Sequence, residues 1–247
     1  MNFPRPSSGG WRRPEVSVVI PCLDEAENAA CYPESLFRPL EEAPFACELI
    51  FSDGGSSDGT PDALEEAAEG RSWVRVLRSA RRLAFGASIA RALPFCSGVH
   101  IALMEADLSF SPADLVRLLS AAEAGGFDCV CGSPFLGSFE GLPPLRRLLT
   151  GAANGLLRLR FGPSITSYTQ IFKLYRADVL RSLDFESTGF ALDAELLAKC
   201  LARGGRVGEV PVTMRARTRG RSKLDMAGEV FSSLRLLARG VASGARP

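Results

Sequence analysis

The sequence predicts an α/β fold in which a mainly parallel central sheet carries helices on both faces. Three observations favour this fold class. Short apolar runs alternate with segments of helical periodicity, the chain is long enough to bury a sizeable core, and no linker or repeat interrupts residues 15–240. Such alternation is typical of parallel strands joined by right-handed crossovers. We therefore expect a single domain.

The first half of the chain contains four expected strands, at 15–20, 47–51, 74–77 and 99–103. Helices are expected between them, from 24 into the low thirties, at 62–69 and at 85–93. Pro21 ends the first strand, and Pro61 suits the first turn of the second helix. This half therefore has the β-α-β-α-β-α-β order that is typical of nucleotide-binding domains.

The second half continues with elements of less regular spacing. Strands are expected at 127–133 and 206–211, and the sequence at 168–175 is strand-like. Helices are expected at 112–124, 145–161, 189–203 and 226–241. Residues 134–144 are rich in glycine and proline and predict a mobile loop, whereas 217–223 predict a basic loop.

Composition and charge argue against several classes of protein. The net charge is +1, so no overall field favours nucleic acid, and no such partner is expected. No run of about 18 apolar residues is present, so no membrane-spanning helix is expected. Residues 1–13 lack the apolar core of a signal peptide and are expected to be a flexible lead-in. The 7 cysteines have irregular spacing, which favours reduced thiols in a cytoplasmic protein.

Two acidic residues follow the fourth expected strand. Glu105 and Asp107 are two positions apart, so on an extended backbone their side chains point the same way. Ligands bind at the carboxyl ends of strands in open α/β sheets. Two carboxylates there can hold a hard divalent cation that carries a phosphate group. The other interpretation is that they only cap the strand and the helix that follows.

A dinucleotide site of the dehydrogenase type is an alternative that the glycines argue against. Such a site needs Gly-x-Gly-x-x-Gly directly after the first strand. This chain has Pro21-Cys22-Leu23-Asp24-Glu25 at that position. Its glycine-rich loop follows the second strand and carries Asp53. Dinucleotide binding is therefore not expected.

The segment 145–161 combines leucines at helical spacing with Arg146, Arg147, Arg158 and Arg160. An ordinary amphipathic surface helix explains this pattern. A basic helix with a leucine face can also lie on an anionic membrane surface. The location that we expect is therefore cytoplasmic, with peripheral contact to the inner face of the cell membrane as the second interpretation.

Four motifs stand in one order along the chain. They are the end of the first strand at 21–25, the glycine-rich loop at 53–60, Glu105-Ala106-Asp107-Leu108-Ser109, and a late acid, Asp193, with a basic stretch from Arg217 to Lys223. Together they closely resemble family 2 glycosyltransferases of the GT-A fold, most of all the dolichol- or polyprenyl-phosphate mannosyltransferase branch. The resemblance covers roughly residues 14–224 and implies one GT-A, Rossmann-like domain.

The resemblance implies an internal organisation for that domain, which is expected to span 14–247. The nucleotide-sugar-binding half is expected at 15–133, and the acceptor half with a closing loop at 134–224. A C-terminal amphipathic helix is expected at 225–247.

The resemblance also implies roles for individual residues. Contacts with the base and ribose of the sugar nucleotide are implied for Pro21, Leu23, Glu25, Phe51 and Asp53. A Mg²⁺ or Mn²⁺ ion on the diphosphate is implied at Glu105, Asp107 and Ser109, with Ala106 also at the donor. Arg217 and Lys223 match cations of a loop that closes over the phosphates. Asp193 matches the acceptor side, and the expected catalytic set is Asp107, Asp193, Arg217 and Lys223.

This sequence departs from the family pattern at four places. Glu105 replaces the first aspartate of the metal motif. Pro134 replaces an arginine that is expected near the acceptor phosphate or the diphosphate. Leu23 and Asp24 replace an aromatic residue and an asparagine, and 167–173 replace the usual Asp-x-Thr-Ser-Gly-Phe-Arg stretch.

The function that the resemblance implies is inverting transfer of a hexose, mannose or glucose, from a GDP- or UDP-sugar to a polyprenyl or dolichyl phosphate. A phosphate acceptor is already an anion near neutral pH and needs no strong base. Transfer to a sugar or small-molecule hydroxyl is the alternative, and Asp193 would then be the base. A non-catalytic homologue that binds nucleotide is a further alternative, which the changes at Glu105 and Pro134 motivate.

Overall fold

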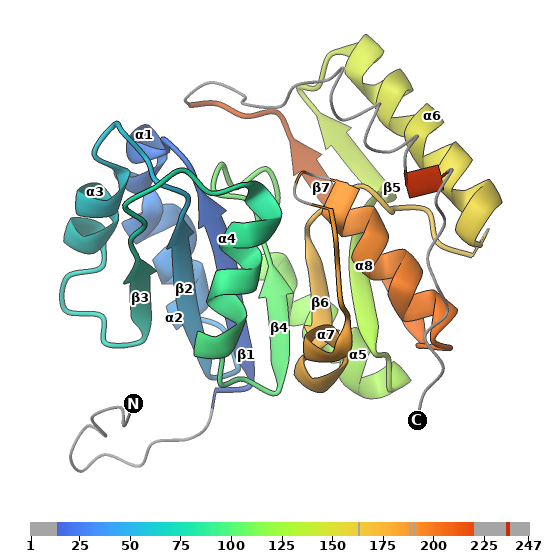
Figure 1. Ribbon diagram of the computed structural model, residues 1–247, viewed down its shortest axis with the longest axis horizontal. Coiled ribbons are helices and arrows are strands. Elements are labelled where there is room, and N and C mark those ends of the chain that lie inside the picture. The colour runs from blue at the N-terminus through green and yellow to red at the C-terminus, as the bar shows by residue number, and fades with distance from the viewer. Residues whose placement is uncertain (1–13, 163, 188, 190, 220–235, 238–247) are drawn as a thin grey trace.

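The computed structural model of the chain describes residues 14–162, 164–187, 189, 191–219 and 236–237. Its centre is a 7-stranded sheet in the order β3-β2-β1-β4-β6-β5-β7 (Figure 1). The strands are β1 (Val16–Cys22), β2 (Cys47–Asp53), β3 (Val74–Leu77), β4 (His100–Leu103), β5 (Cys129–Glu140), β6 (Lys173–Arg176) and β7 (Val207–Arg215). Only the pairs that include β6 are antiparallel among these strands. The mainly parallel sheet that the sequence predicts is confirmed.

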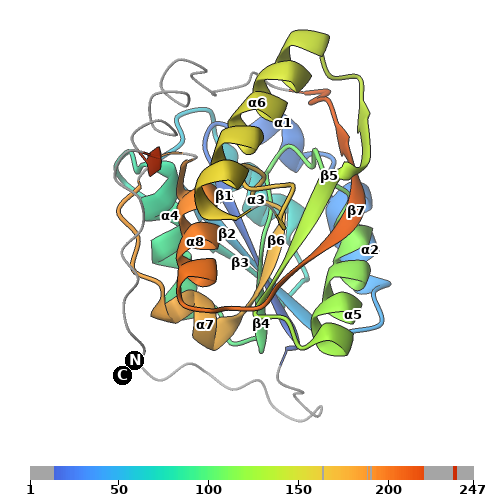
Figure 2. The same ribbon diagram turned by 90° about the vertical axis from the view of Figure 1, so that its right-hand side faces the viewer.

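Helices cover both faces of the sheet (Figure 2). One face carries α1 (Ala26–Ala29), the π-helical turn η1 (Pro33–Phe37), α2 (Arg38–Glu41), α3 (Thr60–Ala67), the 3-10 turn η3 (Pro112–Asp114) and α5 (Leu115–Gly125). The other face carries α4 (Phe85–Ala92), the 3-10 turn η2 (Leu93–Phe95), α7 (Ala177–Ser182) and α8 (Ala191–Ala202). α6 (Pro144–Phe161) lies beside α8 and adds Leu157 to the core of that second face.

The central strands are apolar on both sides, and this gives the domain two cores. In β1, Val18 and Ile20 face the core that contains α2 and α5, whereas Val19 faces the core that contains α4 and α8. All three side chains are fully buried. This is the pattern of a parallel strand that is covered on both faces. Because only β6 is reversed, β1, β2, β4 and β7 all end at the same edge of the sheet.

The prediction of a mobile loop at 134–144 is wrong. β5 continues through this segment to Glu140, and beyond a bulge it pairs with the end of β7, with Ser138 opposite Thr213. Gly137 permits the pairing, because a Cβ atom there would lie 2.1 Å from the carbonyl oxygen of Val212. Glycine here therefore allows two strands to approach closely rather than a chain to turn.

Other expected elements differ in extent. The strand-like stretch at 168–175 is a strand only from Lys173, and the expected helix from Asp24 is interrupted, with the π-helical turn η1 between α1 and α2. The expected lead-in at 1–13 lies outside the described residues, and so does the expected helix at 226–241 except for 236–237. Among the described helices, none combines the length and apolar character that crossing a membrane requires.

Candidate active site

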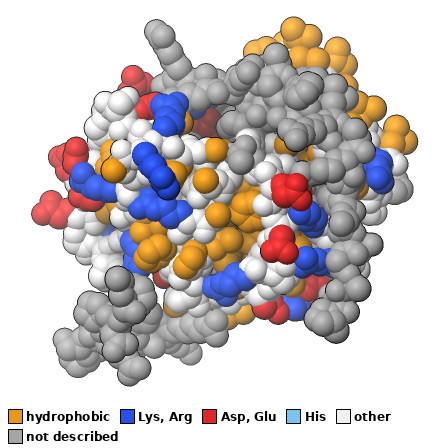
Figure 3. Space-filling model, viewed as in Figure 1, with side chains coloured by type: hydrophobic (Ala, Val, Ile, Leu, Met, Phe, Trp, Pro, Cys, Tyr) orange, Lys and Arg blue, Asp and Glu red, His pale blue; other side chains and the backbone are white. Residues whose placement is uncertain are grey.

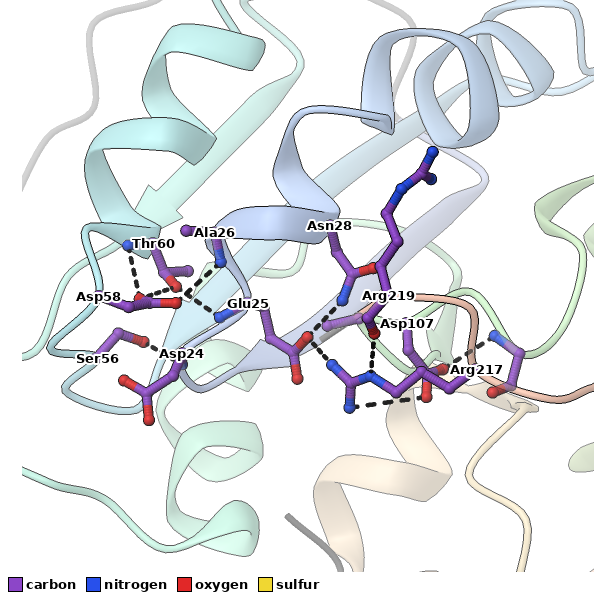
Figure 4. A network of polar contacts seen from close by, with 12 residues as sticks. Asp24, Glu25, Ala26, Asn28, Ser56, Asp58, Thr60, Asp107, Arg217 and Arg219 are labelled. Carbon is purple, nitrogen blue, oxygen red and sulfur yellow. Dashed lines mark hydrogen bonds and ion pairs between the residues drawn. The ribbon is translucent and has the colours of Figure 1, made fainter. Parts of the chain in front are cut away.

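The residues that were expected to bind a sugar nucleotide come together where the parallel strands end. Glu25 follows β1, Asp53 ends β2, Asp107 follows β4, and Arg217 follows β7. Figure 4 shows Glu25, Asp107 and Arg217 converging from three separate segments. The fold therefore joins groups that are as far apart in sequence as Glu25 and Arg217, which are separated by 192 positions.

The loop after β1 is held against the loop after β2 (Figure 4). The backbone N–H of Asp24 donates to Ser56 Oγ at 2.8 Å, and that of Glu25 donates to Thr60 Oγ1 at 2.7 Å. Asp24 has a φ of 48°, a left-handed conformation that aspartate and asparagine adopt more readily than most residues. Its carboxylate accepts from the Ser57 N–H at 2.8 Å. This backbone suits the aspartate of this chain as well as the asparagine of the family pattern.

Asp53 is buried and organises the glycine-rich loop. Its carboxylate accepts hydrogen bonds from the backbone N–H groups of Gly55 and Ser56, both at 3.1 Å, and of Ser79 at 3.3 Å. Gly55 has a φ of 81°, and a Cβ atom there would lie 2.4 Å from the carbonyl oxygen of Arg81, so glycine is required. Asp53 therefore shapes the loop in addition to any contact that it makes with a nucleotide.

The other residues that were expected to contact the base differ in exposure. Pro21 and Leu23 are partly exposed at the end of β1. Phe51 is fully buried, and its ring stacks on that of Tyr32 with the centroids 5.4 Å apart. The Phe51 side chain therefore forms part of the floor under the site and does not line its surface.

Glu105 and Asp107 lie in a turn, because β4 ends at Leu103. The expectation that an extended strand aligns the two carboxylates is therefore wrong, and Leu108 adopts a left-handed φ of 52° as the chain turns. Asp107 Oδ1 accepts from the backbone N–H of Ser109 at 2.9 Å. Burial raises the pKa of Glu105 well above its usual range, and the nearby Asp107 and Asp193 carboxylates raise it further. The two acids are therefore close enough for the charge of Asp107 to act on Glu105, although no strand aligns them.

The two acids fit a divalent cation. Within the described part of the chain, the buried Oε2 atom of Glu105 has no hydrogen-bond partner. A buried carboxylate oxygen without a donor is costly, and a hard cation shared with Asp107 would satisfy it. No cluster of three or more His, Cys, Asp or Glu residues among the described residues could hold a metal. Glu105 and Asp107, with Ser109 adjacent, would supply only part of a cation's oxygen ligands.

Arg217 bridges the two acidic positions (Figure 4). Its guanidinium pairs closely with the Glu25 carboxylate, and its Nη1 lies 3.9 Å from Asp107 Oδ2. Glu25 also accepts from Asn28 Nδ2 at 2.5 Å. A cationic group thus occupies the space between the end of β1 and the acid turn. Lys223, the second expected cation of this loop, lies outside the described residues.

Charged residues of α6, α8 and β6 also act on Glu105. Asp193 lies in the first turn of α8 and is 2% exposed. Lys173 begins β6, is 1% exposed and donates to the carbonyl oxygen of Tyr168 at 3.1 Å. The charges of Lys173 and of Arg146 in α6 oppose the rise in the pKa of Glu105 that burial, Asp107 and Asp193 cause. The charges of two cations, Lys173 and Arg146, therefore partly offset the negative charge around Glu105.

Sequence reasoning missed Arg146 and Lys173 as residues of the site. A signal for Arg146 exists in the helical periodicity, because Arg146 lies about three helical turns before the buried Leu157 and therefore on the same face of α6. Arg147 points elsewhere, and its guanidinium lies 5.3 Å from the ring centroid of Phe139. No comparable signal exists for Lys173, whose burial depends on where the antiparallel strand β6 is inserted in the sheet.

The chain matches Glycosyl transferase family 2 over residues 17–184. Undecaprenyl-phosphate mannosyltransferase of Micrococcus luteus is 30% identical over 217 residues, which are 85% of this chain and 87% of that protein. Glycosyltransferase AglD of Haloferax volcanii is 26% identical over 232 residues. That match covers 92% of this chain but only 37% of AglD, so the chain spans little more than a third of that relative.

Solved structures of glucosyl-3-phosphoglycerate synthase from Mycobacterium tuberculosis share the fold. The complex with Mn²⁺, UDP and glucosyl-3-phosphoglycerate has a TM-score of 0.68 at 22% identity, covering 96% of this chain and 84% of that chain. The complex with Mn²⁺, UDP-glucose and phosphoglyceric acid has a TM-score of 0.69 at 22% identity, covering 96% of this chain and 87% of that chain. These likenesses confirm the GT-A fold. The family match and the Micrococcus relative show that the chain belongs to glycosyl transferase family 2, whose members are enzymes that transfer sugars.

Proposed function

We propose that the chain transfers a hexose, mannose or glucose, from a nucleoside diphosphate sugar to a polyprenyl phosphate, with inversion of the anomeric carbon. An oxygen of the acceptor phosphate forms a bond to that carbon. The bond from the same carbon to the donor diphosphate breaks, and the nucleoside diphosphate leaves with the electron pair. The Micrococcus relative, which is named for undecaprenyl phosphate, supports this class of acceptor.

Helix α6 provides the observation that carries the proposal. The charge of its Arg146 acts on the buried Glu105 and lowers the pKa of that carboxyl group, and its leucines face outward. The exposed leucines are Leu145, Leu148, Leu149, Leu156 and Leu159, which are 40–87% exposed. Figure 3 shows the corresponding hydrophobic atoms at the upper right, where α6 lies in Figure 1. One helix thus presents an apolar surface for a lipid and a cation for the phosphate of the same molecule.

The donor side fits the same reaction. Glu25 and the loop that Asp53 organises would hold the nucleoside, and Arg217 with Lys223 would contact the diphosphate. Glu105 and Asp107 would hold Mn²⁺ or Mg²⁺, which neutralises charge on the leaving diphosphate. An anionic acceptor needs orientation rather than deprotonation. Arg146, which is partly exposed, would orient it, whereas the buried Lys173 would contribute only its charge.

Transfer assays with matched arginine variants test the acceptor side. The chain would be incubated with Mn²⁺, polyprenyl phosphate in detergent, and UDP- or GDP-linked glucose or mannose. Arg146→Ala should lower kcat/KM for the lipid by about tenfold or more, the loss expected for one charge-assisted contact. Arg147→Ala removes an equal charge from the same turn of α6. This variant should change kcat/KM for the lipid less than about twofold. Equal losses in the two variants would contradict the assignment of Arg146.

A hydroxyl acceptor is the second candidate, and the position of Asp193 favours it. This carboxylate is buried near Glu105, where it could accept a proton from an acceptor hydroxyl. Transfer to 3-phosphoglycerate or a sugar, with none to polyprenyl phosphate, would establish this alternative. Nucleotide binding without transfer to any acceptor would favour the non-catalytic homologue.

Peripheral membrane contact through α6 is part of the proposal and has its own test. α6 has four arginines and no acidic residue, so its exposed leucines should bind anionic vesicles in a salt-sensitive manner. In flotation assays at low salt, the double change Leu148→Ser and Leu159→Ser should reduce binding several-fold. Val99→Ser changes a residue that is 46% exposed, directly before the central strand β4, and is the control. Absence of vesicle binding by the parent chain would argue for a water-soluble acceptor.

A further inference from the structure

Tyr32 is a buried residue outside the motifs that the family resemblance covers, yet its hydroxyl reaches the acid turn. The side chain is fully buried, directly before the π-helical turn η1. Its hydroxyl donates to the carbonyl oxygen of Ala106 at 2.6 Å, across 74 positions of sequence. Ala106 is the residue between Glu105 and Asp107, so this hydrogen bond holds the backbone that joins the two acids of the candidate metal site.

The acid turn has few other anchors among the described hydrogen bonds. The N–H of Leu108 donates to the carbonyl oxygen of Glu105 at 3.4 Å, which is a long hydrogen bond. Ser109 is better fixed, because its N–H donates to Asp107 and its carbonyl oxygen accepts from the Arg215 N–H at 2.8 Å. The peptide between the two acids is thus held chiefly by Tyr32, and its orientation decides where both carboxylates point.

The ring of Tyr32 makes a second connection, to the nucleoside end of the site. It stacks on Phe51 of β2 at an interplanar angle of 8°, and Phe37 packs edge-on against it with the centroids 6.2 Å apart. Burial raises the pKa of Tyr32 well above its usual range, and Cys22, Glu25 and Asp107 raise it further. The hydroxyl therefore stays protonated at neutral pH and remains a donor.

We infer that Tyr32 is a positioning residue for the metal and diphosphate, and that it links the nucleoside floor to the acid turn. The inference rests on the proposed donor site at Glu105 and Asp107. The phenol fixes the peptide between the two acids, so that both carboxylates are already directed at one cation before it binds. Preorganisation of this kind lowers the cost of binding, because less of the chain must be ordered by the ligand.

Tyr32→Phe is the test, because it removes one oxygen atom and keeps the stacked ring. Titration calorimetry would measure the affinities for Mn²⁺ in the presence of UDP and for UDP with and without Mn²⁺. Loss of one buried hydrogen bond should weaken Mn²⁺-dependent UDP binding about three- to tenfold. UDP binding without Mn²⁺ should change less than about twofold. In transfer assays, the KM for the donor should rise at limiting Mn²⁺ and recover at saturating Mn²⁺.

Two further tyrosines serve as matched controls. Tyr168→Phe also removes a hydroxyl that donates to a carbonyl oxygen, that of Gly162 at 3.0 Å, far from the acid turn in sequence. Tyr175→Phe removes a buried hydroxyl that has no hydrogen-bond partner among the described residues. Both should leave Mn²⁺-dependent UDP binding unchanged, even where Tyr168→Phe lowers Tm as much as Tyr32→Phe does.

The outcomes separate this inference from the proposed function. Equal Mn²⁺-dependent affinities in the parent chain and Tyr32→Phe would overturn the role of Tyr32 and leave the donor site in place. A parent chain that binds neither UDP nor GDP with Mn²⁺ would instead overturn the donor site itself. Equal weakening by Tyr32→Phe and Tyr168→Phe would show a general effect of stability and would also overturn the inference.

Discussion

Glu105 is the residue at which the demands of folding and of function are opposed. Its folded-state pKa is raised by burial, then by Asp107 and Asp193, so the folded chain holds a proton that the unfolded chain releases. Without metal, the free energy of unfolding should therefore fall as pH rises above the ordinary value of 4.5 and toward the raised one. Below 4.5 both states are protonated and this penalty is absent.

Glu105→Gln should remove the pH-dependent penalty. We expect the variant to have a higher Tm than the parent at pH 7.5 without metal, and a smaller difference at pH 5. Mn²⁺ should raise the Tm of the parent more than that of the variant, because the cation binds the carboxylate in the folded state only. Thermal unfolding at both pH values, with and without Mn²⁺ and UDP, measures this. Glu69→Gln changes an exposed carboxylate and is the control. It should leave Tm unchanged at both pH values, with and without Mn²⁺ and UDP.

Asp53 has a structural role that its position after a strand did not reveal. The sequence predicts a nucleotide contact, but the carboxylate is 1% exposed and already accepts three backbone N–H groups. Asp53→Ala should lower the free energy of unfolding by about 1.5–3 kcal/mol, as well as weakening nucleotide binding. Urea unfolding monitored by circular dichroism gives the stability. Asp62→Ala removes an exposed carboxylate that pairs with Arg78, and it should cost no more than about 1 kcal/mol.

At the scale of elements, most of the described helices and strands could be predicted from sequence, and the outer part of β5 could not. β1, β2 and β3 lie within two residues of the expected ranges, because apolar runs between helices identify buried parallel strands. The outer part of β5 pairs with β7 over a separation of 75 positions, and nothing local to 134–144 specifies that partner. Glycine and proline predict a loop when only their neighbours are considered.

Helix α6 was predicted at 145–161 and is found at Pro144–Phe161, but its attachment to the domain was not foreseen. Asn154 of α6 is 2% exposed. Its Oδ1 accepts from the Tyr168 N–H at 2.6 Å and from the Thr169 N–H at 3.2 Å, and its Nδ2 donates to Thr169 Oγ1 at 2.9 Å. A single polar residue thus ties the helix to the segment that leads into Lys173.

Asn154→Ala should loosen the segment around Tyr168 and Thr169, because the N–H groups of both residues lose their acceptor. We expect faster amide hydrogen exchange at these two residues, and a free energy of unfolding lowered by about 1–3 kcal/mol. The rate of amide exchange in β1 should change only by the amount that the change in global stability accounts for. Thr213→Ala, which removes the exposed contact with Ser138, is the control and should leave exchange at 168–169 unchanged. Unaltered exchange at those amides in Asn154→Ala would contradict the attachment.

At the scale of the whole molecule, the candidate site joins segments from the beginning, the middle and the end of the described chain. The resemblance could place acids after the first, second and fourth strands, because strand ends are visible in sequence. It could not show that Arg217 lies between Glu25 and Asp107, since this depends on β7 being parallel to β4 across an antiparallel β6. Sheet order is a global property, and it decides which loops become neighbours.

Arg217 should therefore have one role in the free protein and another with the donor bound. Without ligand it offsets the repulsion between the Glu25 and Asp107 carboxylates, and its side chain is 14% exposed. A cation bound at Asp107 would compete for that carboxylate, and a diphosphate would offer the guanidinium a stronger, charge-assisted partner. The loop after β7 should change its contacts when donor and metal bind.

Arg217→Ala tests this exchange of partners. The affinity for UDP with Mn²⁺ should fall about ten- to a hundredfold, the range of one charge-assisted contact with phosphate, and the loss should shrink at high salt. Arg215→Ala is the matched control, because Arg215 ends the same strand but pairs on the surface with Glu140, at 3.1 Å and with both side chains 55% exposed. It should change the affinity less than about twofold. Tryptic cleavage after Arg219 should also slow when UDP and Mn²⁺ are added to the parent chain. A cleavage rate that does not respond to ligand, together with equal affinities in the two variants, would show that Arg217 only neutralises its two carboxylates and does not contact the donor.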